Sequence, residues 1–355
     1  MARAYYIGMD VHKKETEFAV VTQTGSISRR VRCRTAIPEL RAVIDQVPRQ
    51  RHAVIEEGPL ADWLLRNLQG QVDDFVVCDP RRNSLIAKDS DKDDPIDAEK
   101  LAQLYRGGYV RPVHHSEELA RTCFKERVGV YHDRVRNRVR QANRIISQFA
   151  RHGVLLDEAG FSDSDERRMS LRQLRGRRSV REDIQLLLVG YDVAVEQQDQ
   201  MQRRLVREAR KVEPIRRFMG LPGIGWIRAS TFYAYVDTPW RFKKKSALWK
   251  YMGIGLERRT SGSGPVCLQV ARHANRRLKD MILGAAGSAI RSGNDNPFAQ
   301  QYRRHMHEGL SPQNARRNVA RSQAAVLWGM WKSGDVYRPE WVGVAVASKE
   351  TGCGS

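Results

Sequence analysis

The sequence is poor in cysteine and has no long apolar run. Its five cysteines among 355 residues are scattered and form no C-x-x-C pair, which argues against a disulfide framework or a zinc finger. The longest apolar run, AAVLWGMW at 324–331, is too short to span a bilayer. The N-terminal MARAYYIGMD leads into a strand pattern without an apolar signal region. We therefore expect reduced thiols and a soluble intracellular protein with no membrane partner.

What the sequence has in excess is positive charge. It contains 62 Lys+Arg against 41 Asp+Glu, a formal net charge of +21. Residues 1–112 are nearly neutral, with 18 basic and 17 acidic residues, whereas the remainder holds 44 basic and 24 acidic residues. Such an excess favours a polyanionic partner, and nucleic acid is the usual one. The division predicts a metal site in the neutral part and a phosphate-binding surface in the basic part.

The first part alternates strand and helix patterns. Residues 5–25 read as two strands joined by a turn, 52–68 as a short strand followed by an amphipathic helix, and 73–80 as another strand. A further helix is expected from DPIDAEKLAQL, beginning at Asp94. Strands mixed with helices over about 110 residues predict an α/β domain.

The second part reads as helices. Apolar residues recur at helical spacing from about 116 to 212, under many arginines, which predicts an antiparallel helical hairpin. This hairpin could be a plain bundle with a solvated face, or an arm that dimerises or grips nucleic acid. In LPGIG, Gly223 and Gly225 resemble the turn of a helix-hairpin-helix DNA binder. A helix, a Gly/Ser loop flanked by arginines and a basic helix follow over 246–290.

Carboxylates stand at three places where strands or helices meet turns. Asp10 ends the first apolar run, Glu56 and Glu57 end a later strand, and Asp94 and Asp97 lie three apart at a helix start. Two like charges one turn apart repel unless a cation lies between them. The alternative is a solvated acidic loop at a helix N-terminus, where aspartate is favoured by the dipole. Taken together, the three places suit a Mg²⁺ site that bridges phosphate oxygens.

These motifs resemble a known family. The order Asp, Glu, Asp-x-x-Asp in YIGMDVHKKETEFAVV, VIEEGPLADWL and KDDPIDAEKLAQL is similar to the RuvC-like domain of the DEDD insertion-sequence transposases, which are related to the Piv DNA invertase. LPGIGWIRASTFYAYV, YMGIGLERRTSGSG and ARHANRRLKDMILGAA resemble that family's C-terminal transposase domain. The resemblance implies a multidomain α/β plus α protein with a ribonuclease H-like domain at 1–115, a coiled-coil arm at 116–212, a mainly helical transposase domain at 213–340 and a tail at 341–355.

The resemblance also implies the site residues. Asp10, Glu56, Asp94 and Asp97 take the positions that bind Mg²⁺ or Mn²⁺, and Ser261 in RTSGSG takes the position of the serine nucleophile. The phosphate or RNA contacts are expected from five arginines: Arg258, Arg259, Arg272, Arg276 and Arg277.

Two alternatives stay open within this set. The family commonly has Glu-Ala-Thr-Gly after its second strand, whereas EEGP here leaves Glu57 as a rival to Glu56, which directly follows the apolar AVI. In the loop, Ser263 also precedes a glycine and Thr260 also carries a hydroxyl, so only the distance from GIGLERR favours Ser261. Without the resemblance, this loop would be read as a polar turn.

The resemblance implies DNA strand exchange through a serine–DNA intermediate. Its partners would be donor and target DNA, a guide (bridge) RNA and further copies of the chain, as dimers that pair into tetramers in a prokaryotic cytoplasm at the nucleoid. One alternative is a metal-dependent nuclease like a Holliday-junction resolvase, which would use the same carboxylates with water in place of Ser261. Another is a basic RNA-binding structural protein, which needs neither site.

Overall fold

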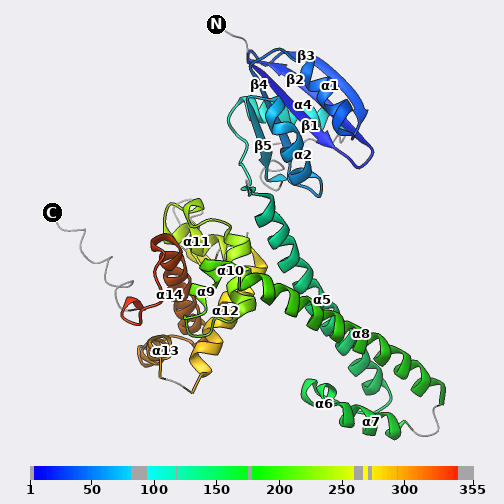
Figure 1. The fold of residues 1–355 in the computed structure, drawn as a ribbon, viewed down its shortest axis with the longest axis vertical. Helices are drawn as coiled ribbons and strands as arrows, with labels where there is room; N and C mark the ends of the chain where they lie inside the picture. The colour runs from blue at the N-terminus through cyan, green and yellow to red at the C-terminus, as the bar shows by residue number, and fades with distance from the viewer. Residues whose placement is uncertain are drawn as a thin grey trace, which may run out of the picture. The chain divides into compact units, whose positions relative to one another are not determined.

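The chain divides into two units, Met1–Glu117 and Glu118–Ser355. The computed structural model describes residues 4–80, 94–116, 118–174, 178–259, 267–270, 274–293 and 295–342. Figure 1 shows a β-sheet with helices in the first unit and mainly helices in the second. The mixed α and β composition expected from the sequence is confirmed.

The first unit is built on a five-stranded sheet in the order β3-β2-β1-β4-β5. Its strands are β1 Tyr5–Val11, β2 Glu15–Thr22, β3 Ile27–Arg34, β4 Arg51–Glu56 and β5 Asp74–Cys78. The first three strands pair antiparallel, whereas β4 lies parallel to both β1 and β5. The predictions of strands within 5–25, 52–68 and 73–80 are confirmed, and β3 was not predicted.

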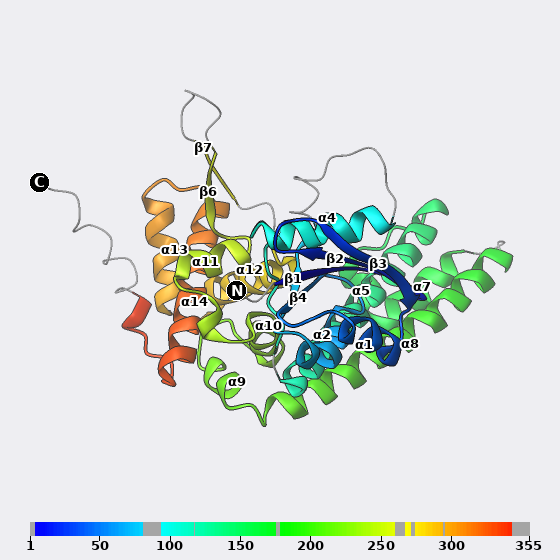
Figure 2. The same ribbon diagram turned by 90° about the horizontal axis from the view of Figure 1, so that it is seen from above.

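Helices cover both faces of this sheet, as Figure 2 shows. They are α1 Ile37–Asp45 and α2 Ala61–Leu68, followed by the short η1 Gln69–Gln71, on one face and α4 Asp94–Arg106 on the other. Ile7, Met9 and Ile55 are buried against α1 and α2. Val54 and Cys78 face the other way and pack with Leu101 of α4. Because strand side chains alternate between faces, β4 and β5 contribute residues to both cores.

The second unit contains a long helical hairpin. Helices α5 Leu119–Arg151 and α8 Arg178–Ala209 pack along each other, and α6 Glu158–Ser162 and α7 Ser164–Gln173 lie at its tip. Phe149 of α5 and Phe161 of α6 are buried in a core of their own with residues of α8. The predicted antiparallel hairpin is confirmed, whereas α6 and α7 were not predicted.

The N-terminal part of α5 and the C-terminal part of α8 pack in the hydrophobic core of the C-terminal helices. These elements are α9 Glu213–Phe218, α10 Trp226–Val236, η2 Pro239–Arg241, α11 Lys245–Tyr251, β6 Leu256–Arg259, β7 Cys267–Val270, α12 Arg276–Arg291, α13 Pro297–His307 and α14 Pro312–Ser333. Val128 of α5 and Leu205 of α8 are fully buried with Phe218 and Phe232. Arg121 of α5 also pairs with Asp237 after α10, at 2.8 Å. The hairpin and the C-terminal helices are therefore one packed unit.

Among the helices that the structure describes, none is both long enough and apolar enough to cross a membrane.

Candidate carboxylate site and nucleophile loop

Asp10 and Glu56 lie at the C-terminal ends of the neighbouring parallel strands β1 and β4. Met9 of β1 stands opposite Ile55 of β4, and Asp10 and Glu56 are the next residues along the two strands. Met9 and Ile55 are buried on the face covered by α1 and α2. Since side chains alternate, Asp10 and Glu56 belong to the opposite face, which α4 covers. Strand register therefore brings two of the predicted ligands to the same end of the strands and to the same face of the sheet.

Helix α4 runs antiparallel to β1 on that face. The ring of Tyr6, at the start of β1, lies 5.7 Å from that of Tyr105, near the end of α4. Further along β1, a Cβ atom on Gly8 would lie 2.0 Å from the carbonyl oxygen of Ala98 and 2.7 Å from the amide nitrogen of Ala102. The first turn of α4 is therefore at the end of β1 where Asp10 lies.

Asp94 and Asp97 belong to this first turn. Asp97 is exposed and precedes by one turn Leu101, which packs on Val54 of β4, so it continues the row of positions that faces the sheet. Asp94 is the first residue of α4, and its side chain lies outside the described part of the chain. The helix thus adds at least one carboxylate position to the strand ends.

The chemistry of these donors fits a hard divalent cation, because carboxylate oxygens are the ligands that Mg²⁺ and Mn²⁺ prefer. Among the residues whose side chains the structure describes, no three His, Cys, Asp or Glu lie close enough together to hold a metal ion. The side chain of Asp94 is not in that set. The site as described is a pair of strand-end carboxylates with Asp97 at the start of the covering helix.

Glu57 has contacts of a different kind. Its backbone N–H donates to the carbonyl oxygen of Cys78 at 2.9 Å, and its carboxylate lies 2.7 Å from Nε2 of His115. Nδ1 of the same imidazole is 3.6 Å from Asp62, which Arg66 pairs at 2.8 Å. Glu57 therefore belongs to a charged network, whereas Glu56 follows the register of Asp10. This difference favours Glu56 as the ligand.

Two histidines beside these carboxylates were not predicted. Nε2 of His12 lies 3.1 Å from the Asp10 carboxylate, and His115 contacts Glu57. His12 had a sequence signal, because it follows Asp10 by two residues in MDVHKK. His115 had none, because only the fold brings it from a position 58 residues away to Glu57.

The predicted nucleophile lies outside the described residues. Ser261 and its rivals Thr260 and Ser263 stand in the sequence between β6 and β7, which pair antiparallel from Leu256 opposite Val270 to Arg259 opposite Cys267. Arg272 is also outside the described residues, as are the side chains of Arg258 and Arg259. The role of Ser261 as nucleophile and the nucleic-acid contacts of Arg258, Arg259 and Arg272 stay predictions.

The two remaining arginines begin α12. Arg276 is exposed, and the first turn is capped by Asn275, whose side chain accepts the N–H of Leu278 at 3.1 Å. Arg277 donates to the hydroxyl of Tyr235 and lies 3.2 Å from Asp133 of α5. Its guanidinium therefore connects three helices, and its contact with nucleic acid stays a prediction, as does that of Arg276.

The LPGIG turn has a packing role. Gly223 has φ +82°, and a Cβ atom there would lie 2.2 Å from the carbonyl oxygen of Ala285 in α12. Arg228 donates to the carbonyl oxygen of Gly223 at 2.7 Å. Only glycine allows both this backbone conformation and this close approach. The turn therefore joins α9 to α10 and packs its backbone directly against α12.

Comparison with protein families finds matches for two stretches of the chain. Residues 7–153, which include the carboxylate site, match the model of the DEDD transposases of the IS110 type. Residues 215–303 match the transposase model of the IS116/IS110/IS902 family. No curated protein matches the chain. The two matches define an insertion-sequence transposase, an enzyme of DNA transposition. The chain belongs to the IS110 family of these transposases.

Proposed function

We propose that this transposase cuts and exchanges DNA strands with two groups of residues. Asp10, Glu56, Asp94 and Asp97 would hold Mg²⁺ or Mn²⁺, and Ser261 would be the nucleophile. The observation that carries the proposal is the register of β1 and β4, which brings Asp10 and Glu56 to the same strand ends, beside the first turn of α4. The assignment of Ser261 as the nucleophile rests on the resemblance of RTSGSG to the sequence around the family's serine.

The carboxylates would hold the cation beside the scissile phosphate, and the serine hydroxyl would attack that phosphate. A bound divalent cation would supply positive charge to the phosphate oxygens, where negative charge develops during the transfer. Oγ of Ser261 bonds to phosphorus and gives its proton to solvent, while the bond from phosphorus to the displaced strand end breaks and that strand end takes up a proton to become a free hydroxyl. One phosphoester replaces another, so the reverse attack by a partner strand rejoins DNA without an external energy source.

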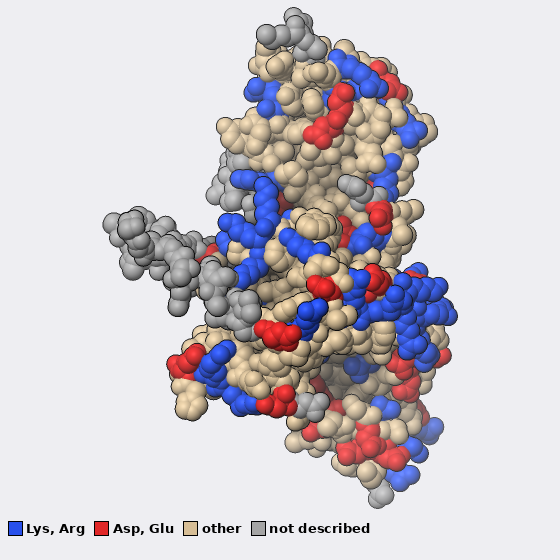
Figure 3. Space-filling view, turned by 60° about the vertical axis from the view of Figure 1, so that its left-hand side comes forward, with Lys and Arg blue, Asp and Glu red and all other residues tan. Residues whose placement is uncertain are grey.

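The basic surface supports a nucleic-acid partner. The chain after residue 112 carries 44 basic and 24 acidic residues, and Figure 3 shows Lys and Arg side chains in several blue groups on one face of the molecule. Donor and target DNA bind there, and a guide RNA is a further partner in the proposal. Exchange between two duplexes needs several active sites, so we infer dimers that pair into tetramers.

A covalent adduct tests the nucleophile. Wild-type protein with Mg²⁺ and its DNA substrate should give a protein–DNA species that survives a denaturing gel, because a phosphoester persists when noncovalent contacts are lost. Ser261→Ala should lose this species and Ser263→Ala, the matched control, should keep it. The opposite pattern would assign the nucleophile to Ser263. Cleavage without an adduct in any variant would point to water, as in a metal-dependent nuclease.

A further inference from the structure

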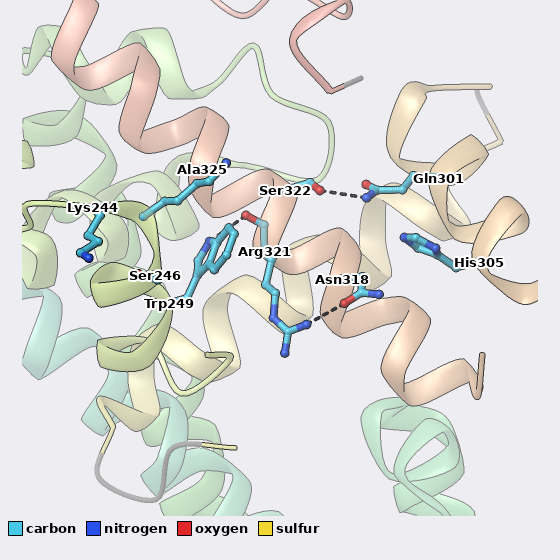
Figure 4. Close-up of a pocket in the computed structure, with 10 residues that line it drawn as sticks. Lys244, Ser246, Trp249, Gln301, His305, Asn318, Arg321, Ser322 and Ala325 are labelled. Carbon is cyan, nitrogen blue, oxygen red and sulfur yellow. Dashed lines mark hydrogen bonds between the residues drawn. The ribbon is translucent and has the colours of Figure 1, made fainter. Parts of the chain in front are cut away.

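Residues of the C-terminal helices line a cavity. It has a volume of about 480 Å³ and lies between α11, α13 and α14, as Figure 4 shows. Its lining includes Lys244, Lys245, Trp249, Gln301, Asn318 and Arg321. Pockets of this size hold small organic ligands. No Asp or Glu is present among the described residues that line the cavity.

One wall is an aromatic ring held in place. Nε1 of Trp249 donates to the backbone carbonyl of Arg321 at 3.0 Å, and this bond fixes the edge of the indole against α14 (Figure 4). The ammonium group of Lys245 lies 5.8 Å from the centre of the same ring. A fixed indole beside positive charge is suited to stacking on a flat, electron-rich ring that carries an anion.

Arg321 adds positive charge to the wall of the cavity. Its Nε donates to the carbonyl oxygen of Ile254 and its Nη1 to Oδ1 of Asn318, each at 2.7 Å. Burial, with Arg317 nearby, lowers the pKa of this guanidinium. No Asp or Glu forms an ion pair with it among the residues that the structure describes. An anion at this wall would therefore compensate a charge that the protein leaves unbalanced.

Two amide side chains, those of Gln301 and Asn318, line the side of the cavity across from Lys244. Gln301 is only 4% exposed, and its Nε2 donates to the hydroxyl of Ser322 at 2.9 Å. Its Oε1 is buried and has no hydrogen-bond partner in the described part of the chain. Buried amide oxygens normally have a partner. Figure 4 shows Gln301 and Asn318 coming from α13 and α14, across from Lys244.

We propose that this cavity holds one unstacked nucleotide of a single-stranded nucleic acid. The base stacks on Trp249, the phosphate is bound by Lys244, Lys245 and Arg321, and the amides of Gln301 and Asn318 line the base. The proposal requires only that the enzyme handles nucleic acid, and it is independent of Ser261 and of the carboxylate site. DNA and RNA share this chemistry, so the test compares the two.

The test uses the full-length protein and a short oligonucleotide with 2-aminopurine at its centre, as DNA and as RNA. Stacking on the indole quenches the fluorescence of this base. Trp249→Leu should weaken binding by about 5- to 150-fold, because loss of one stacking contact costs about 1–3 kcal/mol, and should abolish the quenching. Trp249→Phe should keep most of both, because it retains a ring. Trp240→Leu is the matched control, since Trp240 is exposed outside the cavity.

Quenching with RNA alone, with DNA alone or with both supports the proposal and identifies the strand that the cavity binds. Wild-type affinity and quenching in Trp249→Leu with both oligonucleotides would overturn it. Should Trp249→Leu not fold, Lys244→Gln should lower the slope of log affinity against log salt by about 0.7, whereas the adjacent Lys243→Gln should not. Equal slopes in these two variants would also overturn the proposal. Ser261→Ala and Asp10→Asn should leave the quenching intact, so a failure here is separate from a failure of the cleavage mechanism.

Discussion

Gly8 of β1 and Ala98 of α4 are in backbone contact. A Cβ atom on Gly8 would lie only 2.0 Å from the carbonyl oxygen of Ala98, so a side chain at this position and the present helix cannot coexist. The absence of a side chain lets α4 lie directly on the strand that carries Asp10. The distance between sheet and helix, and with it the position of Asp97, depends on this contact.

Gly8→Ala should therefore damage both stability and cleavage. We expect a loss of about 3 kcal/mol in the free energy of unfolding, at the upper end for overpacking, because the clash is with backbone and not with a flexible side chain. Chemical denaturation measures this loss. Gly70→Ala is the control, since nothing lies within 4 Å of a Cβ atom there. Equal stability of the two variants would contradict the contact.

Glu56→Gln and Glu57→Gln separate the two candidate ligands. Glu56 shares the strand end of Asp10, whereas Glu57 contacts His115. We expect Glu56→Gln to slow DNA cleavage by at least about 100-fold, because it removes a ligand charge near the scissile phosphate. Glu57→Gln should stay within about threefold of wild type. The reverse order in a cleavage time course would transfer the ligand role to Glu57.

His132 should make the second unit less stable in mild acid. Burial, together with Arg277 and Arg136, lowers the pKa of this histidine to about 4, from an ordinary value near 6.5. Between these two values the unfolded chain binds a proton that the folded chain does not, so the free energy of unfolding falls as the pH falls from about 6.5 to about 4. Below that range this contribution stays constant.

The histidine's contribution is isolated by comparing wild type with His132→Asn. Urea denaturation at pH 7 and pH 5 gives the loss of stability in each protein. We expect a smaller loss in His132→Asn, because the variant has no imidazole to titrate at this position. A loss equal to that of wild type would show that His132 is not responsible.

DNA binding should weaken steeply with salt. The excess of basic residues after residue 112 should displace counterions from several phosphates, and each such contact contributes about 0.9 to the slope of log affinity against log salt on duplex DNA. Fluorescence anisotropy between 50 and 200 mM salt measures this slope. A slope near zero would mean that the basic surface does not bind the phosphates.

The strands with clear apolar patterns were predictable from sequence, and the edge strand β3 was not. β1 and β4 carry buried apolar runs, whereas β3 reads ISRRVRCR, is mostly exposed and, within the described part of the chain, pairs with β2 alone. Helix α1 follows it with Pro38 in its first turn, and its short apolar stripe gives a weak signal. Ser261 lies outside the described residues, between β6 and β7 in the sequence.

The carboxylates could be proposed from sequence, but their arrangement could not. The sequence favours Glu56 over Glu57 only because Glu56 directly follows the apolar AVI. The register with β1 and the contact of Glu57 with His115 add a distinction that the sequence does not contain. Gly223 looked like a phosphate-binding turn, yet its packing against Ala285 accounts for the glycine. Both distinctions depend on segments far apart in the chain, which local patterns do not contain.

DNA cleavage by the Asp10→Asn variant tests most directly whether the carboxylate site of the first unit is the catalytic site. The change removes one carboxylate charge at the end of β1 and leaves the basic second unit untouched. We expect strand cleavage in Mg²⁺ to fall at least about 100-fold, with DNA affinity within about twofold of wild type. Asp45→Asn, the same change beside Arg51 at the opposite end of β4, should cleave normally. Wild-type cleavage by Asp10→Asn would contradict the carboxylate site.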